Sequence, residues 1–386
     1  MGVDLAEWLN LALRWLHLTA GIAWIGSSFY FVWLDNHLTR PADGDASGEL
    51  WSVHGGGFYH NQKYQVAPSR MPEHLHWFKW EAYWTWISGF SLLVLIYYVG
   101  AQSFLIDPAK AALSPPAAIA IGLAALALGW LVYDGLCRSP VGSSNLALAV
   151  FWFVCLLLAA SALDRLFNAR AAYLHVGAIV GTVMVGNVFL IIIPNQRKVV
   201  ADLIAGRTPD PALGAAAKQR SLHNNYMTLP VLFIMISHHY PMTYGAERPW
   251  LVLALLGLTG VAVRHAFNLR GRGKATAPTV VVAAALALAS VTYVTLEKKG
   301  AAPGPAGNLT YAEIAPILAT HCSGCHNVPA PPLGVRLDSW EHVRAASERV
   351  KRMAVDSQVM PLGNPTGMTP AERQRLGAWI AAGSPR

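Results

Sequence analysis

The sequence predicts an all-α protein, in which a polytopic membrane helix bundle of about eight transmembrane helices precedes a small all-α domain. Hydrophobic residues make up 54% of the chain and charged residues only 13%, a balance typical of membrane proteins. A segment rich in Gly, Pro and Ala then separates the apolar part from a C-terminal part with soluble helix signals. The predicted divisions are 1–296 for the membrane domain, 297–307 for the linker and 308–386 for the C-terminal domain.

Eight apolar stretches come close to the ~20 residues that a transmembrane helix needs. They cover residues 8–33, 77–99, 117–133, 146–163, 173–193, 223–240, 250–267 and 279–296. The first stretch contains Arg14 and His17, which favours a retained membrane helix over a cleaved signal peptide. An even number of spans puts both ends of the chain on one side of the membrane.

The basic residues of the loops indicate which side that is. If the N-terminus is outside, the inner loops hold twelve Lys and Arg and the outer loops four, as the positive-inside rule requires. This asymmetry also explains much of the net charge of +8. We therefore expect a lipid bilayer as the partner of these basic residues, and no nucleic acid.

The C-terminal part begins and ends with helix signals. Thr310 with Glu313, and Thr369 with Glu372, have the spacing of capping boxes. The last helix should present Leu376, Trp379 and Ile380 on one face. So small a domain buries little apolar surface by itself, which predicts that a bound group forms much of its core.

The pentapeptide Cys322-Ser323-Gly324-Cys325-His326 identifies that group. Two thiols spaced by two residues and followed by histidine form the attachment signature of a covalent c-type haem, with His326 on the iron. The alternatives are a redox CxxC pair or half a zinc site. The chain has no second CxxC that would complete a zinc site. Met360 is the predicted second iron ligand, since a thioether opposite histidine raises the haem potential. Met353 and Met368 compete with it.

Histidines within the apolar stretches are functional candidates, because ionisable groups are costly in lipid. His17 and His175 each share a helix face with small residues, which leaves room for a flat macrocycle. We therefore predict a non-covalent b-type haem between helices, with these two histidines as favoured ligands and His239 and His265 as further metal-binding candidates. The alternative is that these imidazoles only hydrogen-bond neighbouring helices.

A second concentration of polar side chains lies at the predicted inner side. The loop after the first span is rich in Gly, aromatic and charged residues, which is typical of loops that form sites. The inner ends of the sixth and seventh spans add His223, Asn224, Asn225, Arg264, His265 and Asn268. This set suits a planar anion with hydrogen-bonding edges, although interfacial anchoring explains part of it.

These motifs, in this order, resemble the bacterial membrane-bound urate hydroxylases of the PuuD type, a urate oxidase family that joins a membrane domain to a C-terminal cytochrome c. The resemblance rests on 14–17 (Arg-Trp-Leu-His) through 24–26, on 76–82 (His-Trp-Phe-Lys-Trp-Glu-Ala), on 221–230, on 264–268 (Arg-His-Ala-Phe-Asn), and on the C-terminal 360–361 and 379–383. It covers essentially the whole chain.

The resemblance implies oxidation of urate to 5-hydroxyisourate, with water as the hydroxyl source. Such a reaction needs an electron acceptor and a base. Glu81, His76 and His223 are the candidate bases. Arg70, Asn224 and Arg264 are the candidate urate-binding residues. Electrons would leave through the c-type haem to a soluble or membrane cytochrome c, or to a terminal oxidase.

The implied location is the bacterial inner membrane, with both termini periplasmic, because covalent haem attachment takes place on the outer side. A different class of function uses the same histidines. A cytochrome b/c-type module could pass electrons from quinol to cytochrome c without any urate site.

Overall fold

The structure is a computed structural model that describes residues 5–41, 44–68, 71–300, 309–328, 334–362, 364 and 366–386, apart from the side chains of 298–300. Its long helices are α1 (Leu5–His37), α2 (Trp80–Leu93) with its continuation η1 (Val94–Tyr98), α4 (Pro115–Arg138), α5 (Asn145–Leu166), α6 (Ala169–Gly186), which runs through η3 (Asn187–Ile192) into α7 (Ile193–Ile204), α8 (Pro211–Ser237), α10 (Pro249–Gly271) and α11 (Ala277–Gly300). The short elements α3 (Ala101–Phe104), η2 (Pro140–Ser143) and α9 (Pro241–Tyr244) join them.

Helices occupy all eight predicted stretches, so the all-α class is confirmed. Within the described part of the chain, five helical segments are long and apolar enough to cross a membrane, namely α4, α5, α6 with α7, α10 and α11. The chain is therefore a membrane protein with at least these candidate spans. Helices α1 and α8 carry charged residues such as Arg14 and Arg220, and α2 is only 14 residues long before η1 begins, so these three are not among the five. The count of eight spans stays a prediction.

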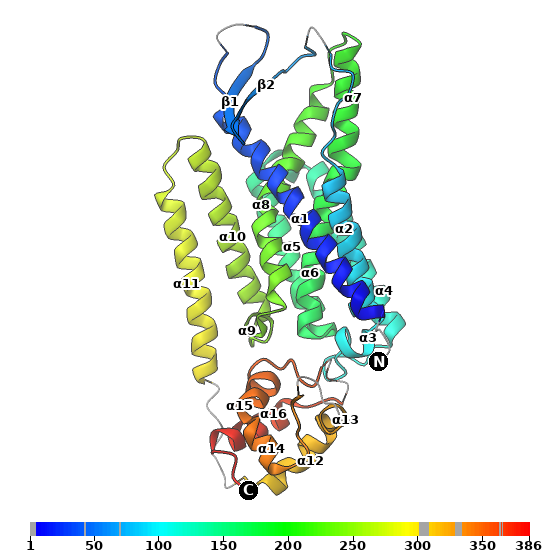
Figure 1. Cartoon of the computed structure of the whole chain (residues 1–386), viewed down its shortest axis with the longest axis vertical. Coiled ribbons are helices and arrows are strands. Elements are labelled where there is room, and N and C mark those ends of the chain that lie inside the picture. The colour runs from blue at the N-terminus through cyan, green and yellow to red at the C-terminus, as the bar shows by residue number, and fades with distance from the viewer. Residues whose placement is uncertain are drawn as a thin grey trace.

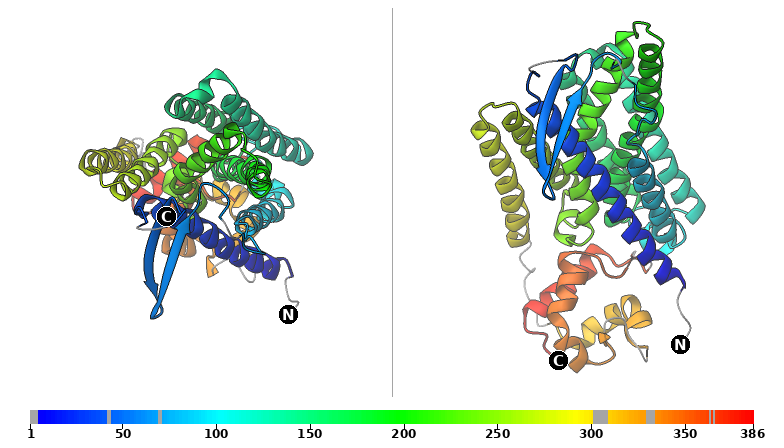
Figure 2. Two further views of the ribbon diagram at one scale, coloured as in Figure 1. Left: turned by 90° about the horizontal axis from the view of Figure 1, so that it is seen from above. Right: turned by 45° about the horizontal axis from the view of Figure 1, so that its top comes forward.

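One part of the inner loop forms strands instead of an irregular loop. Strands β1 (Gly48–His54) and β2 (Gly57–Lys63) pair in an antiparallel hairpin, with His54 opposite Gly57. The turn residues Gly55 and Gly56 have φ of +56° and +81°, which glycine adopts without steric cost. Residues 48–63 of the predicted site-forming loop are therefore a hairpin, which projects from the helix bundle (Figures 1 and 2).

Helix α6 forms the centre of the bundle. Most of its residues are buried, whereas α4, α5 and α11 expose rows of Leu, Val and Phe. Such apolar exposure is what lipid contact requires. Glycines allow close packing: a Cβ on Gly129 would lie 2.5 Å from Ile179, and one on Gly186 would lie 2.5 Å from the Trp130 ring. Small residues thus set the spacing between α4 and α6.

The C-terminal part contains α12 (Tyr311–His321), α13 (Ser323–His326), α14 (Trp340–Ala345), α15 (Ser347–Val350), η5 (Lys351–Asp356) and α16 (Pro370–Ala381). Both capping boxes are present, at Thr310 with Glu313 and at Thr369 with Glu372. Leu376, Trp379 and Ile380 are buried in the core of this part, as the face of the last helix predicts.

The C-terminal helices lie at one end of the bundle, and the β1–β2 hairpin lies at the other (Figures 1 and 2). Helix α1 begins at the end of the bundle where the C-terminal helices lie (Figure 1). The Asn364 amide connects the two parts, since its Nδ2 donates to Asp107 Oδ1 at 3.1 Å. Helix α11 reaches Gly300, so the first residues of the predicted linker are helical. Residues 301–307 lie outside the described ranges.

Candidate functional site

The residues of the CxxCH motif lie on one helical turn. The backbone N–H groups of Cys325 and His326 donate to the Cys322 carbonyl oxygen at 3.2 and 3.0 Å. The Cys322 side chain packs against the C-terminal core, and the Cys325 side chain is exposed. Two thiols and an imidazole therefore emerge from one short segment, as attachment of a haem along its edge requires.

The imidazole of His326 is oriented by a backbone hydrogen bond. Its Nδ1 donates to the Val335 carbonyl oxygen at 2.8 Å, because a carbonyl can only accept. The proton therefore sits on Nδ1, and Nε2 carries the lone pair. A hydrogen bond of this kind fixes the tautomer and orientation of a histidine that binds a metal.

The alternative interpretation, a reactive dithiol, fits the surroundings less well. Burial raises the pKa of the Cys322 thiol to about 11. Redox-active CxxC pairs depend on the opposite shift, which stabilises the thiolate. Among the described residues, no group of three or more His, Cys, Asp or Glu side chains could hold a bare metal ion.

The three candidate methionines occupy different surroundings. Met360 packs against the C-terminal core that Cys322 also contacts. Its carbonyl oxygen accepts a hydrogen bond of 2.6 Å from Arg373, which also donates to the Ala354 carbonyl. Met368 is fully buried within the core, whereas Met353 faces the membrane helices. Together, Cys322, Cys325, His326 and Met360 fit a c-type haem.

His175 makes the contacts of a histidine that joins helices, and its role as a haem ligand stays a prediction. Its Nδ1 donates to the Ala171 carbonyl at 2.8 Å, and its Nε2 accepts from the Tyr98 hydroxyl at 3.3 Å. A Cβ at Gly122 would lie 2.8 Å from that Nε2, so α4 packs directly against the ring. The side chain is fully buried with both nitrogens occupied. These contacts match the alternative in which a histidine joins helices.

His17 contacts α2 and has no described contact with His175. Its Nδ1 donates to the Thr85 carbonyl at 2.9 Å, and a Cβ at Gly89 would lie 2.7 Å from its ring. Of the other candidates, His265 is exposed and its Nδ1 lies 2.7 Å from the Tyr226 hydroxyl, and His239 is exposed beside His238. The predicted pairing of His17 with His175 around one haem therefore has no support in this packing.

The polar residues towards the hairpin end form separate groups. In the first group, the Tyr133 hydroxyl lies 2.7 Å from His223 Nδ1, and Asn145 Oδ1 lies 3.2 Å from His223 Nε2. Asn224 accepts from Asn187 at 2.8 Å. Arg220, which is buried, pairs with Asp134 at 2.6 Å and also binds Asn187. This network satisfies most of its own members.

The second group contains a buried arginine without a carboxylate partner among the described residues. Arg264 Nε donates to Asn225 Oδ1 at 2.9 Å, and its guanidinium lies 3.7 Å from the centroid of the Phe29 ring. Asn268 Nδ2 donates to the same oxygen at 3.0 Å. Asn225 Nδ2 and Asn268 Oδ1 are buried without partners in the described structure. A cation, a free donor and a free acceptor thus lie together.

The remaining predicted residues join neither group. His76 is exposed and packs edge-on against Phe78 at 4.6 Å, and Glu81 is half-buried in the first turn of α2. Arg70 lies outside the described residues. The two amides beside Arg264 belong to the polar set predicted at the inner side, but the sequence did not assign them as urate contacts, although Asn268 follows Arg264 by one helical turn.

Comparisons with known proteins give one match. The family model described as "Urate oxidase N-terminal" matches residues 3–295, which include all the long helices of the bundle. No curated protein and no solved structure matches the chain.

Proposed function

The chain belongs to the urate oxidase N-terminal family, and we propose that it is a membrane-bound urate hydroxylase of the PuuD type with its own cytochrome c domain. The family match supports urate as the substrate and an oxidoreductase as the class of enzyme. The C-terminal motif extends this to cytochrome-linked chemistry, in which urate becomes 5-hydroxyisourate. The observation that carries the proposal is the tautomer of His326, because it leaves the lone pair on Nε2, where an iron can bind.

The acceptor end is assigned to Cys322, Cys325, His326 and Met360. A c-type haem bound there supplies a one-electron acceptor. The thiols hold the group, and the Val335 carbonyl keeps His326 in the ligand tautomer. Arg373 fixes the backbone of Met360 by donating to its carbonyl. These contacts position both side chains before any electron arrives.

The substrate end is assigned to the group around Arg264. Urate is a planar anion whose edges alternate N–H and C=O groups. The Arg264 guanidinium supplies the positive charge, Asn225 Nδ2 can donate to a urate carbonyl, and Asn268 Oδ1 can accept a urate N–H. A buried donor and acceptor without partners are costly, and a ligand with the matching pattern removes that cost.

The reaction requires removal of two electrons and two protons from urate and water together, with the hydroxyl from water bonding to the purine ring. His223, His76 and Glu81 stay the proposed bases that take a proton from water. Tyr133 and Asn145 set the orientation of the His223 ring, since they lie within hydrogen-bond distance of its two nitrogens. Arg70 and Asn224 stay proposed urate contacts.

The proposed location is the bacterial inner membrane, with the C-terminal helices and the start of α1 on the periplasmic side. Both lie at one end of the bundle, which supports this arrangement (Figure 1). Urate would then bind towards the cytoplasm, and a soluble or membrane cytochrome c or a terminal oxidase would accept electrons outside.

The test uses the full chain with both thiols replaced, Cys322→Ala with Cys325→Ala, in isolated membranes. We expect urate to bind to this variant but not to be consumed, whereas wild-type membranes consume urate and reduce added cytochrome c in parallel. Undiminished urate consumption by the double variant would contradict the proposal. Quinol-driven cytochrome c reduction without any effect of urate would favour the electron-transfer module instead.

A further inference from the structure

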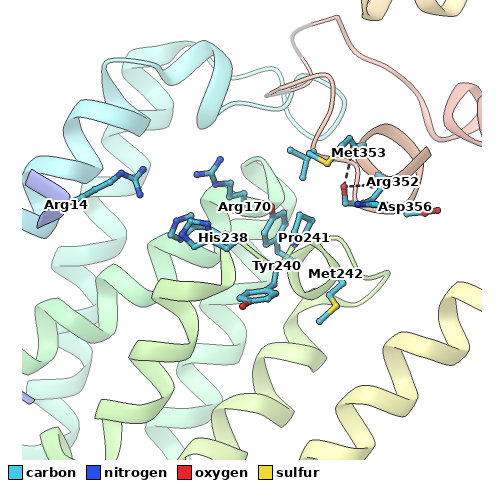
Figure 3. A pocket seen from close by; sticks show the side chains of 13 residues that line it. Arg14, Arg170, His238, Tyr240, Pro241, Met242, Arg352, Met353 and Asp356 are labelled. Atoms are coloured by element: carbon cyan, nitrogen blue, oxygen red, sulfur yellow. Dashed lines mark hydrogen bonds between the residues drawn. The ribbon is translucent and has the colours of Figure 1, made fainter. Parts of the chain in front are cut away.

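A cavity of about 700 Å³ lies between the membrane helices and the C-terminal helices. Its membrane side is formed by Arg14 of α1, Arg170 of α6, His238 and His239 after α8, and Tyr240, Pro241, Met242 and Tyr244 around α9. Its other side is formed by Arg352, Met353, Asp356, Ser357 and Val359. Figure 3 shows Arg14 and Arg170 directed from different helices towards one space, with His238 beside Arg170.

The cavity has an excess of positive charge. Three arginines line it, and its one carboxylate, Asp356, already pairs with Lys351 at 3.0 Å. No described carboxylate lies within ion-pair distance of Arg14 or Arg170, and Arg170 Nε is buried without a partner in the described structure. Arg14 Nε donates to Asn10 Oδ1 at 2.7 Å, but neither guanidinium has a described carboxylate partner. Two such guanidinium groups on one wall indicate a ligand with anionic groups on one edge.

His238 supplies a free lone pair at the same wall. Its Nδ1 donates to the Met235 carbonyl oxygen at 2.6 Å, so the proton sits on Nδ1 and Nε2 is an acceptor. That Nε2 is buried and has no partner among the described residues. A backbone hydrogen bond on Nδ1, with no described hydrogen bond on Nε2, is the arrangement found for His326 in the same chain. It is the tautomer in which imidazole binds a metal.

The rest of the lining suits a large, flat, mostly apolar group. Tyr240, Pro241, Met242 and Tyr244 present rings, methylene groups and a thioether, and Met353 brings a second thioether from the opposite side. The volume falls within the range of about 300–1,000 Å³ typical of cofactor pockets. Haem combines such a macrocycle with two carboxylates on one edge.

We propose that this cavity holds a non-covalent haem, with His238 Nε2 on the iron and Arg14 and Arg170 paired with its propionates. This assignment replaces His17 and His175, which neighbouring helices enclose. It rests on the electron route proposed above. Asn225 on α8 and His238, which directly follows α8, are 13 residues apart, about 20 Å along the helix axis. Val359 lines the cavity and precedes Met360, so a redox group here lies beside the acceptor.

The test counts haems in the purified full-length protein by the pyridine haemochrome method, without urate. We expect one b-type haem for each c-type haem in the wild type. His238→Gly should retain b-type haem at least about tenfold more weakly. Added imidazole should restore its absorption, which a merely misfolded variant would not show. His239→Ala and His17→Ala, as matched controls, should keep the full b-type content.

A second variant tests the proposed pairing of Arg170 with a haem propionate. Arg170→Gln should keep the b-type haem but lower its reduction potential, since removal of a nearby positive charge favours the ferric state. The c-type content serves as the folding check throughout. Absence of b-type haem from the wild type, its full retention in His238→Gly, or its loss in His17→Ala would each overturn the proposal. A quinone or urate recovered from the cavity instead would do the same. None of these outcomes depends on whether the protein oxidises urate.

Discussion

The backbone N–H of Met360 donates a hydrogen bond to the carbonyl oxygen of Met353 at 2.9 Å. The two methionines nevertheless face different surroundings. Met353 lines the cavity against the membrane helices, and Met360 packs against the C-terminal core. One short segment therefore connects the proposed haem c ligand with the end of the membrane bundle.

Replacement of Met360 by Ala should lower the reduction potential of the c-type haem without detaching it. The two thioether bonds would still hold the group, but the thioether ligand that favours the ferrous state would be lost. Redox titration of the purified protein measures this potential. Met368→Leu is the control, because it conserves volume in the core and should cost less than about 1.5 kcal/mol. A larger drop for Met368→Leu than for Met360→Ala would assign the ligand to Met368.

Replacement of Arg264 by Ala should raise the KM for urate by about 10–100-fold, since hydrogen bonds to charged groups contribute about 1.5–3 kcal/mol. Asn268→Leu should raise it by a smaller factor, because it removes a neutral acceptor. Initial rates of urate loss in membranes provide the measurement. Arg270→Ala, an exposed arginine on the same helix, is the matched control. Equal effects of Arg264→Ala and Arg270→Ala would remove the urate site from this group.

Two glycines of α4 should respond in opposite ways to alanine. Gly122→Ala should lower the melting temperature, because the new Cβ would lie 2.8 Å from both His175 Nε2 and the Tyr98 hydroxyl. Overpacking of this kind typically costs about 1–3 kcal/mol. A Cβ on Gly135 would meet no neighbouring atom within 4 Å, so Gly135→Ala should stabilise the helix by up to about 1 kcal/mol. Thermal unfolding in detergent distinguishes them. An unchanged melting temperature for Gly122→Ala would show that α4 does not pack against His175, for example because a haem or an empty space lies between them.

The C-terminal part should lose stability in acid through Glu372. Hydrogen bonds from the backbone N–H and hydroxyl of Thr369 lower the pKa of this carboxyl from 4.5 to about 2. Because the folded pKa is the lower one, the contribution is fully present above pH 4.5 and is lost as the pH falls towards 2. The Soret absorbance of the c-type haem during urea unfolding reports this part alone. The stability difference between the wild type and Glu372→Ala should shrink over that pH range.

The control for that prediction is Glu348→Ala, which changes an exposed carboxyl on α15. A difference between Glu372→Ala and the wild type that stays constant from pH 5 to pH 2 would contradict the proposed role of Thr369. Thr369→Ala should itself cost about 1 kcal/mol at neutral pH, since it removes the N-cap of α16.

The sequence was sufficient for the elements that local patterns determine. Apolar length predicts the helices, and the spacing of Thr310 and Thr369 from their glutamates predicts the capping boxes. The hairpin had a signal too, because Gly55 and Gly56 form the two-residue turn that antiparallel strands favour. It was obscured by the aromatic and charged residues around it, which are equally typical of a site-forming loop.

Partners across helices could not be predicted in this way. Periodicity places His17 and His175 on a helix face, but it does not predict that the neighbouring helices pack against their imidazole rings at Gly89 and Gly122. Likewise, Arg14, Arg170, His238 and Met353 are far apart in the sequence and meet only because α1 and α6 begin, and α8 ends, beside the C-terminal helices. The buried amides beside Arg264 could be suspected from spacing, but their unpaired atoms are visible only in the fold.

The most direct measurement mixes oxidised, purified protein with a limiting amount of urate under anaerobic conditions and follows haem absorption. The proposed mechanism predicts that each urate consumed delivers two electrons to the haem groups, that the new oxygen of the product comes from labelled water, and that no hydrogen peroxide forms when air is admitted. Haem that stays oxidised while urate disappears only in air, with one hydrogen peroxide formed per urate, would contradict it.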